Sequence, residues 1–424
     1  MKNPAIQKNL IITGIIIATN FWSFMLLQDT LILKYASLLV GLIYMLLVFN
    51  PTKTGYYLYD KTSEMDSVVW FTIITIFFSI YVAYHEWHQA PIGTFFNCIR
   101  LTYGLFLYFL LKRWNVSQEK LIKYLTAVCL IWVFLEIFQQ LTYPYYAFSG
   151  RSANGAEIEN RMGMWRFYIF GVDFVMLVYA YWYGNVIRGN NIKDRRKNIL
   201  LTFTFLIGLL LYLSRKHMAV SLLVILLSFF NVSRKKKALF LIVLLLFALI
   251  LATFFLDSFI QMNDDAASNQ GGDGEKFIRY RAALFFLDEV SDSPMYPIWG
   301  LGLEGGGEGP LWDYVQYFQD TYFFYQADTG IIGYYSKFGL IGISAILWYV
   351  VKFLYNWKYI DNWFKYFFIM KILLVFFDFW AMWGVGMFAY GLFLYMLDKN
   401  IIENKKRNKL KLALKKQRKI FCYA

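Results

Sequence analysis

The chain has 424 residues, of which 59% are hydrophobic, 21% are aromatic and 17% are charged, with a formal net charge of +14. Water-soluble domains carry roughly a quarter charged residues, so this composition excludes a soluble enzyme. Seven prolines and the high aromatic content also exclude collagen-like and disordered proteins.

The apolar residues form blocks of a length that can cross a membrane, which takes roughly 20 residues. We therefore expect an all-α, polytopic membrane protein with about twelve transmembrane helices. The expected spans, in chain order, are 10–28, 31–49, 68–84, 93–111, 121–141, 166–187, 199–214, 217–232, 238–256, 328–351, 366–380 and 382–397. Residues 199–232 could form two short spans or one long broken span, and the last two spans carry the same ambiguity. No small-residue cleavage site follows the first block, so we expect a retained span there and not a signal peptide.

The placement of Lys and Arg predicts which loops lie in the cytoplasm. With the N-terminus in the cytoplasm, the basic segments all fall in cytoplasmic connections or in the tail. These segments are Lys112–Lys120, Arg188–Lys197, Arg234–Lys237, Lys358 with Lys365, and Lys405–Lys419. The high net charge is thereby explained without a nucleic-acid partner. The tail could also bind anionic lipid, but we favour its interpretation as a stop signal with a solvated end.

One large loop, residues 257–327, is expected on the outer side. It holds twelve Asp or Glu and three Lys or Arg, and loops of this length are usually functional or disordered. Apolar residues at helical spacing over 275–290 predict an amphipathic helix. A glycine-rich run at 300–309 predicts a flexible turn. The chain thus divides into a transmembrane bundle (1–256), the loop (257–327), C-terminal transmembrane helices (328–398) and a basic tail (399–424).

Arginines on the predicted outer side are the first candidate site residues. They are Arg151, Arg161, Arg166, Arg215, Arg279 and Arg281. Any one of them could simply reach the lipid headgroups. The positive-inside rule disfavours cations on this side, however, so a shared anionic ligand would explain their retention as a group, and guanidinium binds phosphate in a bidentate way. Arg279 and Arg281 are two residues apart, so on a helix only one of them should enter a site.

Other ionisable groups have plainer interpretations. Asp328 precedes Gly330 at the start of a span, where it could cap the helix or act chemically. Asp173, Asp378 and Lys371 lie inside spans, and we expect them to pair with one another. Gly330, Gly333, Gly339 and Gly342 should allow helices to approach closely. His85, His88 and His217 form no metal-ligand pattern, so neither a metal nor a cofactor is expected.

Four local motifs resemble bacterial O-antigen polymerases and the wider superfamily of lipid-linked oligosaccharide polymerases and O-antigen ligases. They are Ser214-Arg215 at the end of a span, Ile278-Arg279 at the start of the loop helix, residues 297–302 (Pro-Ile-Trp-Gly-Leu-Gly), and residues 327–333 (Ala-Asp-Thr-Gly-Ile-Ile-Gly) followed by Lys337-Phe338-Gly339. Their order and spacing agree with the family over most of the chain.

The resemblance implies a metal-independent multi-span glycosyltransferase of the bacterial inner membrane, with both termini in the cytoplasm and the large loop in the periplasm. Its substrates would be oligosaccharides on undecaprenyl pyrophosphate, used for O-antigen, capsule or exopolysaccharide. Membrane lipid and a chain-length regulator protein are the other implied partners. The family's outer arginines correspond to Arg215 and Arg279, with Arg281, Arg161 and Arg166 as substrate-binding candidates.

One departure from the family bears on the reaction. Ligases of this group usually have a histidine in the large loop before the following span, and this loop has none. Asp320 lies in the comparable region, which favours a polymerase. Asp320 or Asp328 could accept the proton of the acceptor hydroxyl. The alternatives are a ligase that transfers finished glycan to an acceptor, and an exporter of lipid-linked glycan without enzyme activity.

Overall fold

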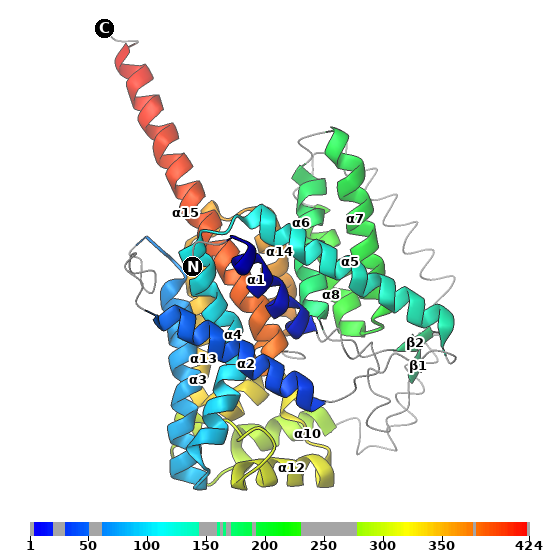
Figure 1. Cartoon of the computed structure of the whole chain (residues 1–424), viewed down its shortest axis with the longest axis vertical. Helices are drawn as coiled ribbons and strands as arrows, with labels where there is room; N and C mark the ends of the chain where they lie inside the picture. The colour runs from blue at the N-terminus through cyan, green and yellow to red at the C-terminus, as the bar shows by residue number, and fades with distance from the viewer. Residues whose placement is uncertain are drawn as a thin grey trace.

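The structure is a computed structural model that describes residues 4–19, 30–50, 62–143, 159–161, 164–166, 171–188, 192–229, 278–375 and 379–421. Most of these residues are helical (Figure 1). Four of the described helices are long and apolar enough to cross a membrane: α3 (Asp66–Trp87), α4 (Pro91–Trp114), α5 (Gln118–Thr142) and α13 (Ile331–Tyr355). The chain is therefore a mostly helical protein with helices of the membrane-spanning type.

Helices in the first half of the described chain overlap the predicted spans, and α3, α4 and α5 among them are long and apolar enough to cross a membrane. Besides these three, this half contains α1 (Pro4–Thr19), α2 (Thr30–Phe49), α6 (Val172–Arg188), α7 (Ile192–Leu211) and α8 (Arg215–Phe229). Segment 199–232 therefore contains two helices. They are separated by a turn in which Leu213 has a φ of 50°, a left-handed conformation that ends α7. The predicted span 238–256 lies outside the described residues.

A two-stranded antiparallel hairpin, β1 (Glu159–Arg161) and β2 (Met164–Arg166), lies between α5 and α6. The predicted span from residue 166 was wrong at its start, because Arg166 belongs to β2 and α6 begins at Val172. Gly171 precedes this helix with a φ of 105°, a conformation that residues with a side chain rarely adopt. The hairpin is a small addition to an otherwise helical fold.

The second half begins with short elements and ends with long helices. The short elements are α10 (Ile278–Leu284), the π-helix η4 (Phe285–Glu289), α11 (Tyr296–Trp299), α12 (Pro310–Tyr322) and the 3-10 turn η5 (Gln326–Thr329). After α13 come η6 (Trp357–Tyr359), α14 (Asn362–Leu374), η7 (Trp380–Met382) and α15 (Gly384–Phe421). The predicted helix over 275–290 is confirmed for its described part, 278–289.

Contacts between the helices define two ends of the bundle. At the loop end, Asn97 near the start of α4 binds the carbonyl of Glu304, and the N–H of Ile331 at the start of α13 binds the carbonyl of Val375 after α14. At the tail end, Asp66 at the start of α3 pairs with Lys112 near the end of α4. Figure 1 shows α10 and α12 at one end and the C-terminus at the other. The described part of the large loop therefore lies at one end of the bundle, and the connection after α4 and the C-terminal helix lie at the other.

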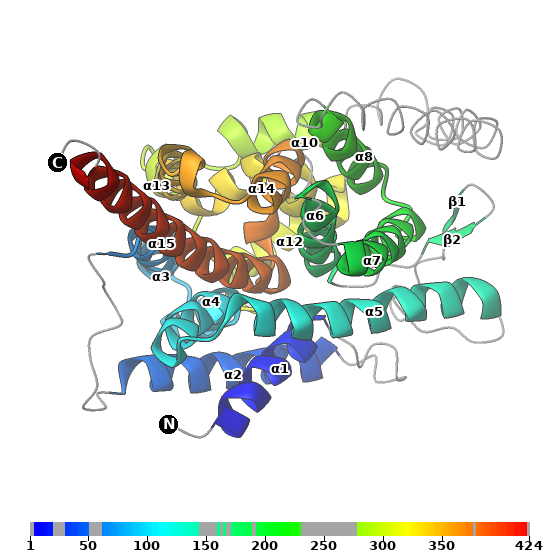
Figure 2. The ribbon, with the colours of Figure 1, turned by 90° about the horizontal axis from the view of Figure 1, so that it is seen from above.

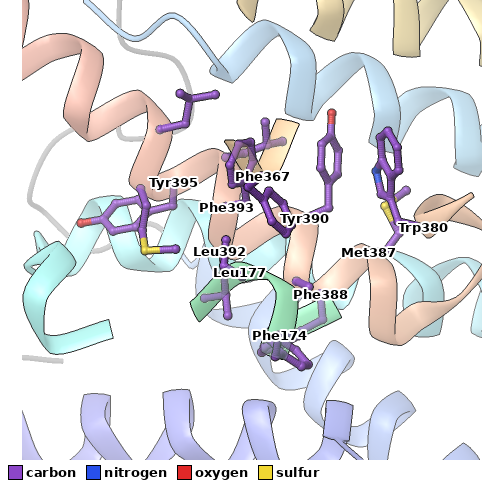
Figure 3. Packing of buried hydrophobic residues seen from close by; sticks show 14 of the residues in the cluster. Phe174, Leu177, Phe367, Trp380, Met387, Phe388, Tyr390, Leu392, Phe393 and Tyr395 are labelled. Atoms are coloured by element: carbon purple, nitrogen blue, oxygen red, sulfur yellow. The ribbon is translucent and has the colours of Figure 1, made fainter. Parts of the chain in front are cut away.

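The core is rich in aromatic residues and is centred on α15. Figure 3 shows Phe174 and Leu177 of α6 and Phe367 of α14 packed around buried residues of the first half of α15. The parallel contact between α4 and α15 depends on glycine, because a Cβ on Gly104 would overlap the backbone of Phe388. Seen from above (Figure 2), α1 and α2 lie on one side of α4 and α5, and α6, α7 and α8 lie beyond α5.

The last helix, α15, has 38 residues and continues without a break from the core into the basic tail. Figure 1 shows its second half extending beyond the bundle. The predicted boundary between residues 398 and 399 therefore falls inside one helix. Asn400 and Asn404 bind Asp361 at the tail end, and Lys405 pairs with Glu64, so several polar contacts hold the helix where it leaves the bundle.

Candidate functional site

The described part of the large loop folds around its own small apolar cluster. Phe285 and Phe286 of η4, Leu311 and Val315 of α12, and Phe324 are all buried within it. The ring centroids of Phe285 and Phe318 lie 4.4 Å apart, which fixes α12 against η4. The opposite face of α12 carries exposed Asp313, Tyr317 and Asp320. One side of α12 is thus packed against the apolar cluster of the loop, and its other side is an exposed polar and aromatic surface.

The glycine-rich run is ordered at its start, so the prediction of a flexible turn was wrong for residues 300–304. The N–H of Leu301 binds the carbonyl of Ser336 at 2.7 Å, and the N–H of Gly302 binds the carbonyl of Lys337 at 3.0 Å. A Cβ on Gly300, which has a φ of 73°, would lie 2.5 Å from the carbonyl carbon of Lys337. Glycine is therefore needed for this strand-like contact between the loop and α13.

An ion pair holds the same segment from the other side. Lys337 Nζ lies 3.0 Å and 3.2 Å from the two carboxylate oxygens of Glu304, and both side chains are largely buried. Asn97 Nδ2 binds the backbone oxygen of Glu304 at 2.9 Å. Since Asn97 is on α4 and Lys337 is on α13, residue 304 joins the loop to two helices of the bundle.

The expectation of close approach is confirmed for Gly333 and Gly339, where the elements that approach α13 are the short helices η5 and α11 of the loop. A Cβ on Gly333 would overlap the carbonyl of Gln326, and one on Gly339 would overlap the backbone of Ile298. Gly339 has a φ of 57° and breaks the helical conformation inside α13. Both positions let loop segments lie directly against α13.

The two loop arginines differ in their surroundings. Arg279 and Arg281 are both exposed on α10. The guanidinium of Arg281 lies over the ring of Phe324, with 6.0 Å between its carbon and the ring centroid. Arg281 is thereby held against the loop cluster, whereas Arg279, two residues earlier, lies on nearly the opposite side of the helix.

The candidate acids are exposed. Asp320, on α12, accepts a hydrogen bond of 2.8 Å from Gln316. Asp328 lies in η5, which packs against α10, the helix that carries the loop arginines. The proposed capping role of Asp328 was wrong, because the residue at the N-cap of α13 is Gly330 and no side chain caps this helix end. Asp328 is therefore free of a structural capping function.

Arg215 is the first residue of α8, and its side chain lies outside the described part of the structure. The contacts of α8 show at which end of the bundle the backbone of Arg215 lies. Tyr179 of α6 donates to the carbonyl of Ser221, and Tyr183 bonds to Ser228, so α6 and α8 run in the same direction. Asp173 at the start of α6 pairs with Lys371 near the end of α14, which belongs to the loop end. The start of α8, and with it the backbone of Arg215, therefore also lies at the loop end.

The remaining predicted arginines belong to the hairpin. Arg161 is in β1 and Arg166 is in β2, where it pairs in register with Glu159; their side chains and all of Arg151 lie outside the described part. Gln140 near the end of α5 binds both the N–H and the carbonyl of Trp165. The hairpin is thus attached to the end of α5, and the structure does not bring it into described contact with α10.

The expected pairing of buried charges is confirmed for Asp173 and Lys371, and Asp378 lies outside the described residues. Sequence reasoning overlooked two other groups inside spans. Glu136 on α5 is fully buried, and neither of its carboxylate oxygens has a hydrogen-bond partner among the described residues. Arg100 on α4 has a buried Nε that also has no partner there. An ionisable residue within an apolar run is itself a signal, which could have identified both.

No group of three or more His, Cys, Asp or Glu side chains suited to a metal ion occurs within the described ranges. Comparisons of the chain with protein-family models and with curated proteins found no match. The functional interpretation therefore depends on the chemistry and placement of the residues at the loop end.

Proposed function

We propose that this protein polymerises oligosaccharide repeat units carried on a polyprenyl diphosphate, and that glycosyl transfer takes place at the loop end. The observation that carries the proposal is the position of the cations. Arg279 and Arg281 on α10 and the start of α8 with Arg215 occupy the end of the bundle opposite the basic tail. Guanidinium groups at this position suit an anionic group held just outside the apolar region.

In the proposed reaction, a hydroxyl of the acceptor glycan attacks the anomeric carbon of the donor. The new glycosidic bond forms as the bond from that carbon to the diphosphate oxygen breaks, and the diphosphate leaves with the electron pair. Arg279 and Arg215 stabilise the negative charge that develops on the leaving group. The hydroxyl proton passes to a carboxylate, for which Asp320 and Asp328 are the candidates.

The geometry of the loop supports different roles for its charged residues. Arg281 lies on the ring of Phe324, which favours a role in orienting the substrate. Arg279 is exposed on the same short helix, within one turn of it, and η5 with Asp328 packs against this helix. A cationic group and a candidate base thus belong to adjoining elements, as transfer between two bound glycans requires.

The test is the length distribution of the surface glycan in a deletion strain complemented with variants. The strain without the protein should make glycan of single repeat units. Arg279→Ala and Arg215→Ala should reproduce that state, because loss of one charge-stabilising donor lowers such rates by roughly 10²–10³-fold. Arg407→Ala is the matched control, since Arg407 is an exposed arginine of α15 at the tail end.

Each alternative has its own outcome. Normal chain lengths in both loop-end variants would refute the arginine mechanism. Finished polymer that accumulates on the polyprenyl carrier in the deletion strain would indicate a ligase. Lipid-linked single units trapped on the cytoplasmic leaflet would indicate an exporter.

A further inference from the structure

The exposed side of α12 carries both carboxylates and an aromatic ring. Asp313, Tyr317 and Asp320 are three or four residues apart, so they lie on one side of the helix. All three are exposed, and Tyr317 is 55% exposed. The ring centroid of Tyr317 lies 6.3 Å from that of Tyr322, which is also exposed. Rings and carboxylates therefore share one surface at the loop end.

Phe323, the residue that ends α12, is an unusual choice for its position. It has a φ of 58°, a left-handed conformation that costs energy for any residue with a side chain, and glycine is the usual residue at such a helix end. Its ring is 59% exposed, so burial offsets little of that cost. Neither the backbone nor the core explains an aromatic side chain here. Residues held in such conformations cluster at catalytic and ligand-binding sites.

The same surface leads toward the loop arginines. Phe324, the next residue, is buried in the loop cluster and has the guanidinium of Arg281 over its ring. Tyr325 is exposed again, and η5, which follows it, packs against α10. Figure 1 shows α10 and α12 together at this end of the molecule. We call the exposed residues of this surface the aromatic–acid strip; they are Asp313, Tyr317, Asp320, Tyr322, Phe323 and Tyr325.

The chemistry of the strip selects its partner. Residues 310–325 contain two Asp and no Lys or Arg, whereas helices that lie on a lipid surface are rich in Lys and Arg. Carboxylates accept hydrogen bonds from hydroxyl groups. Tyrosine and phenylalanine rings offer rigid apolar faces for stacking. A chain of sugar rings, which combines apolar C–H faces with many hydroxyl groups, matches both kinds of side chain.

We propose that the aromatic–acid strip binds the acceptor glycan and leads it to the arginines of α10. Sugar rings stack on Tyr317 and Phe323, and sugar hydroxyls donate to Asp313 and Asp320. The choice of the acceptor rests on the proposed function, which requires a glycan at the loop end. The binding of a glycan as such rests on the chemistry of the strip.

The test is equilibrium binding of the strain's own surface glycan, released from its lipid by mild acid, to the purified full chain in detergent micelles, measured by calorimetric titration. Phe323→Gly should weaken binding roughly fivefold, the size of one lost aromatic contact. Its unfolding midpoint should stay level or rise, because glycine adopts the left-handed conformation without strain. A variant that binds less while folding at least as well separates a binding role from a structural one.

Two further variants complete the comparison. Tyr317→Ala should weaken binding by a similar factor. Tyr355→Ala is the matched control, since Tyr355 is an exposed tyrosine at the tail end of α13, and it should bind as the native chain does.

Unchanged glycan affinity in both strip variants, or no binding by the native chain, would overturn the proposal, and the strip would then face the lipid headgroups instead. An equal loss in Tyr355→Ala would also overturn it, because the effect would not belong to the strip. The outcome for the proposed function is read separately in the deletion strain. Binding lost in the strip variants together with normal chain lengths in that strain means that the polymerase function fails and the glycan surface stands. Single repeat units in that strain together with unchanged affinity in the variants means the reverse.

Discussion

At the scale of single residues, Lys337 has a structural role that its position in a family-like motif does not reveal. Its ammonium group binds both carboxylate oxygens of Glu304, and only 13% and 12% of the two side chains are exposed. The partners are 33 residues apart in the chain, so the pair fixes the loop to α13. Removal of one partner leaves the other charge buried without compensation.

Lys337→Met should therefore destabilise the protein by roughly 3 kcal/mol, the lower range for breaking a buried pair. The double variant Lys337→Met with Glu304→Gln should recover much of this loss, because no buried charge is then left alone. The measurement is the unfolding midpoint of the purified protein in detergent. Equal destabilisation in the single and double variants would show that the pair itself is not the cause.

Glu64, just before α3, links stability to pH at the tail end. Burial raises the pKa of Glu64, but the hydrogen bond and charge of Lys405 and the charge of Lys352 together outweigh it, so the net pKa is below the usual value. A carboxyl group with a lowered folded-state pKa adds stability above its unfolded-state pKa of about 4.3. That contribution disappears as the pH falls through the folded-state pKa.

Glu64→Gln should therefore lower the unfolding midpoint at pH 7 and have progressively less effect as the pH falls below about 4.3. The comparison is a series of thermal unfolding curves for the native chain and the variant over this pH range. A difference between the two proteins that stays constant with pH would contradict the link to the charge of Glu64.

At the scale of elements, the two parts of α13 make different contacts. Its first part receives the loop through Ser336, Lys337 and Gly339. Its later part is an apolar helix with one side buried, as at Tyr349, and the other exposed, as at Leu347. The backbone of Gly339, with a φ of 57° and a ψ of −158°, permits the change between the two parts, since a residue with a side chain pays roughly 1–3 kcal/mol to adopt this rare conformation.

Gly339→Ala should destabilise the protein by more than that conformational cost alone, because the new methyl group would also overlap the backbone of Ile298. Leu340→Ala is the matched control at the next position, where the leucine is 56% exposed. Its unfolding midpoint in detergent should stay near that of the native chain. Equal midpoints for Gly339→Ala and the control would refute the role assigned to this glycine.

The elements also show what the sequence pattern could and could not predict. Apolar blocks predicted the described spanning helices because the bilayer itself sets their length. The pattern did not reveal that residues 300–304 are held in place. Glu304 is bound by Asn97 and Lys337, and both of these residues are distant from it in the chain. The left-handed turn at Leu213 was also hidden, because leucine has no preference for it. The continuous α15 was predictable in principle, as Lys and Leu are good helix formers and the tail has no proline.

At the scale of the site, the residue types were easier to predict than their placement. The loop arginines were identified because cations on the predicted outer side are unusual. Asp320 was identified because the family resemblance places a histidine of the ligases in the comparable region of the loop. The separate roles of the arginines were not identified, since the position of Arg281 over Phe324 depends on how α10 packs on the loop cluster. Arg100 and Glu136 were overlooked because each lies within an apolar run.

At the scale of the whole molecule, the two polar ends of the bundle have opposite characters. The tail end carries Lys112, Lys352 and Lys405 and leads into the basic part of α15. The loop end carries the acidic loop and the arginines of α10. This separation agrees with an orientation in which the tail faces the cytoplasm and the loop faces outward. The proposed transfer reaction requires that orientation, because the arginines must meet substrate outside the lipid.

Cysteine labelling in intact cells tests this orientation most directly. Tyr280→Cys on α10 and Leu410→Cys on α15 would each be placed in a chain carrying Cys422→Ser, with the buried Cys98 and Cys129 left unchanged. Tyr280 and Leu410 are 61% and 65% exposed, so a maleimide that cannot cross the inner membrane can reach either position from its own side. With the outer membrane made permeable, position 280 should be labelled at once, and position 410 only after the inner membrane is opened. Labelling of position 280 only from the cytoplasmic side, or of both positions from the same side, would contradict the account.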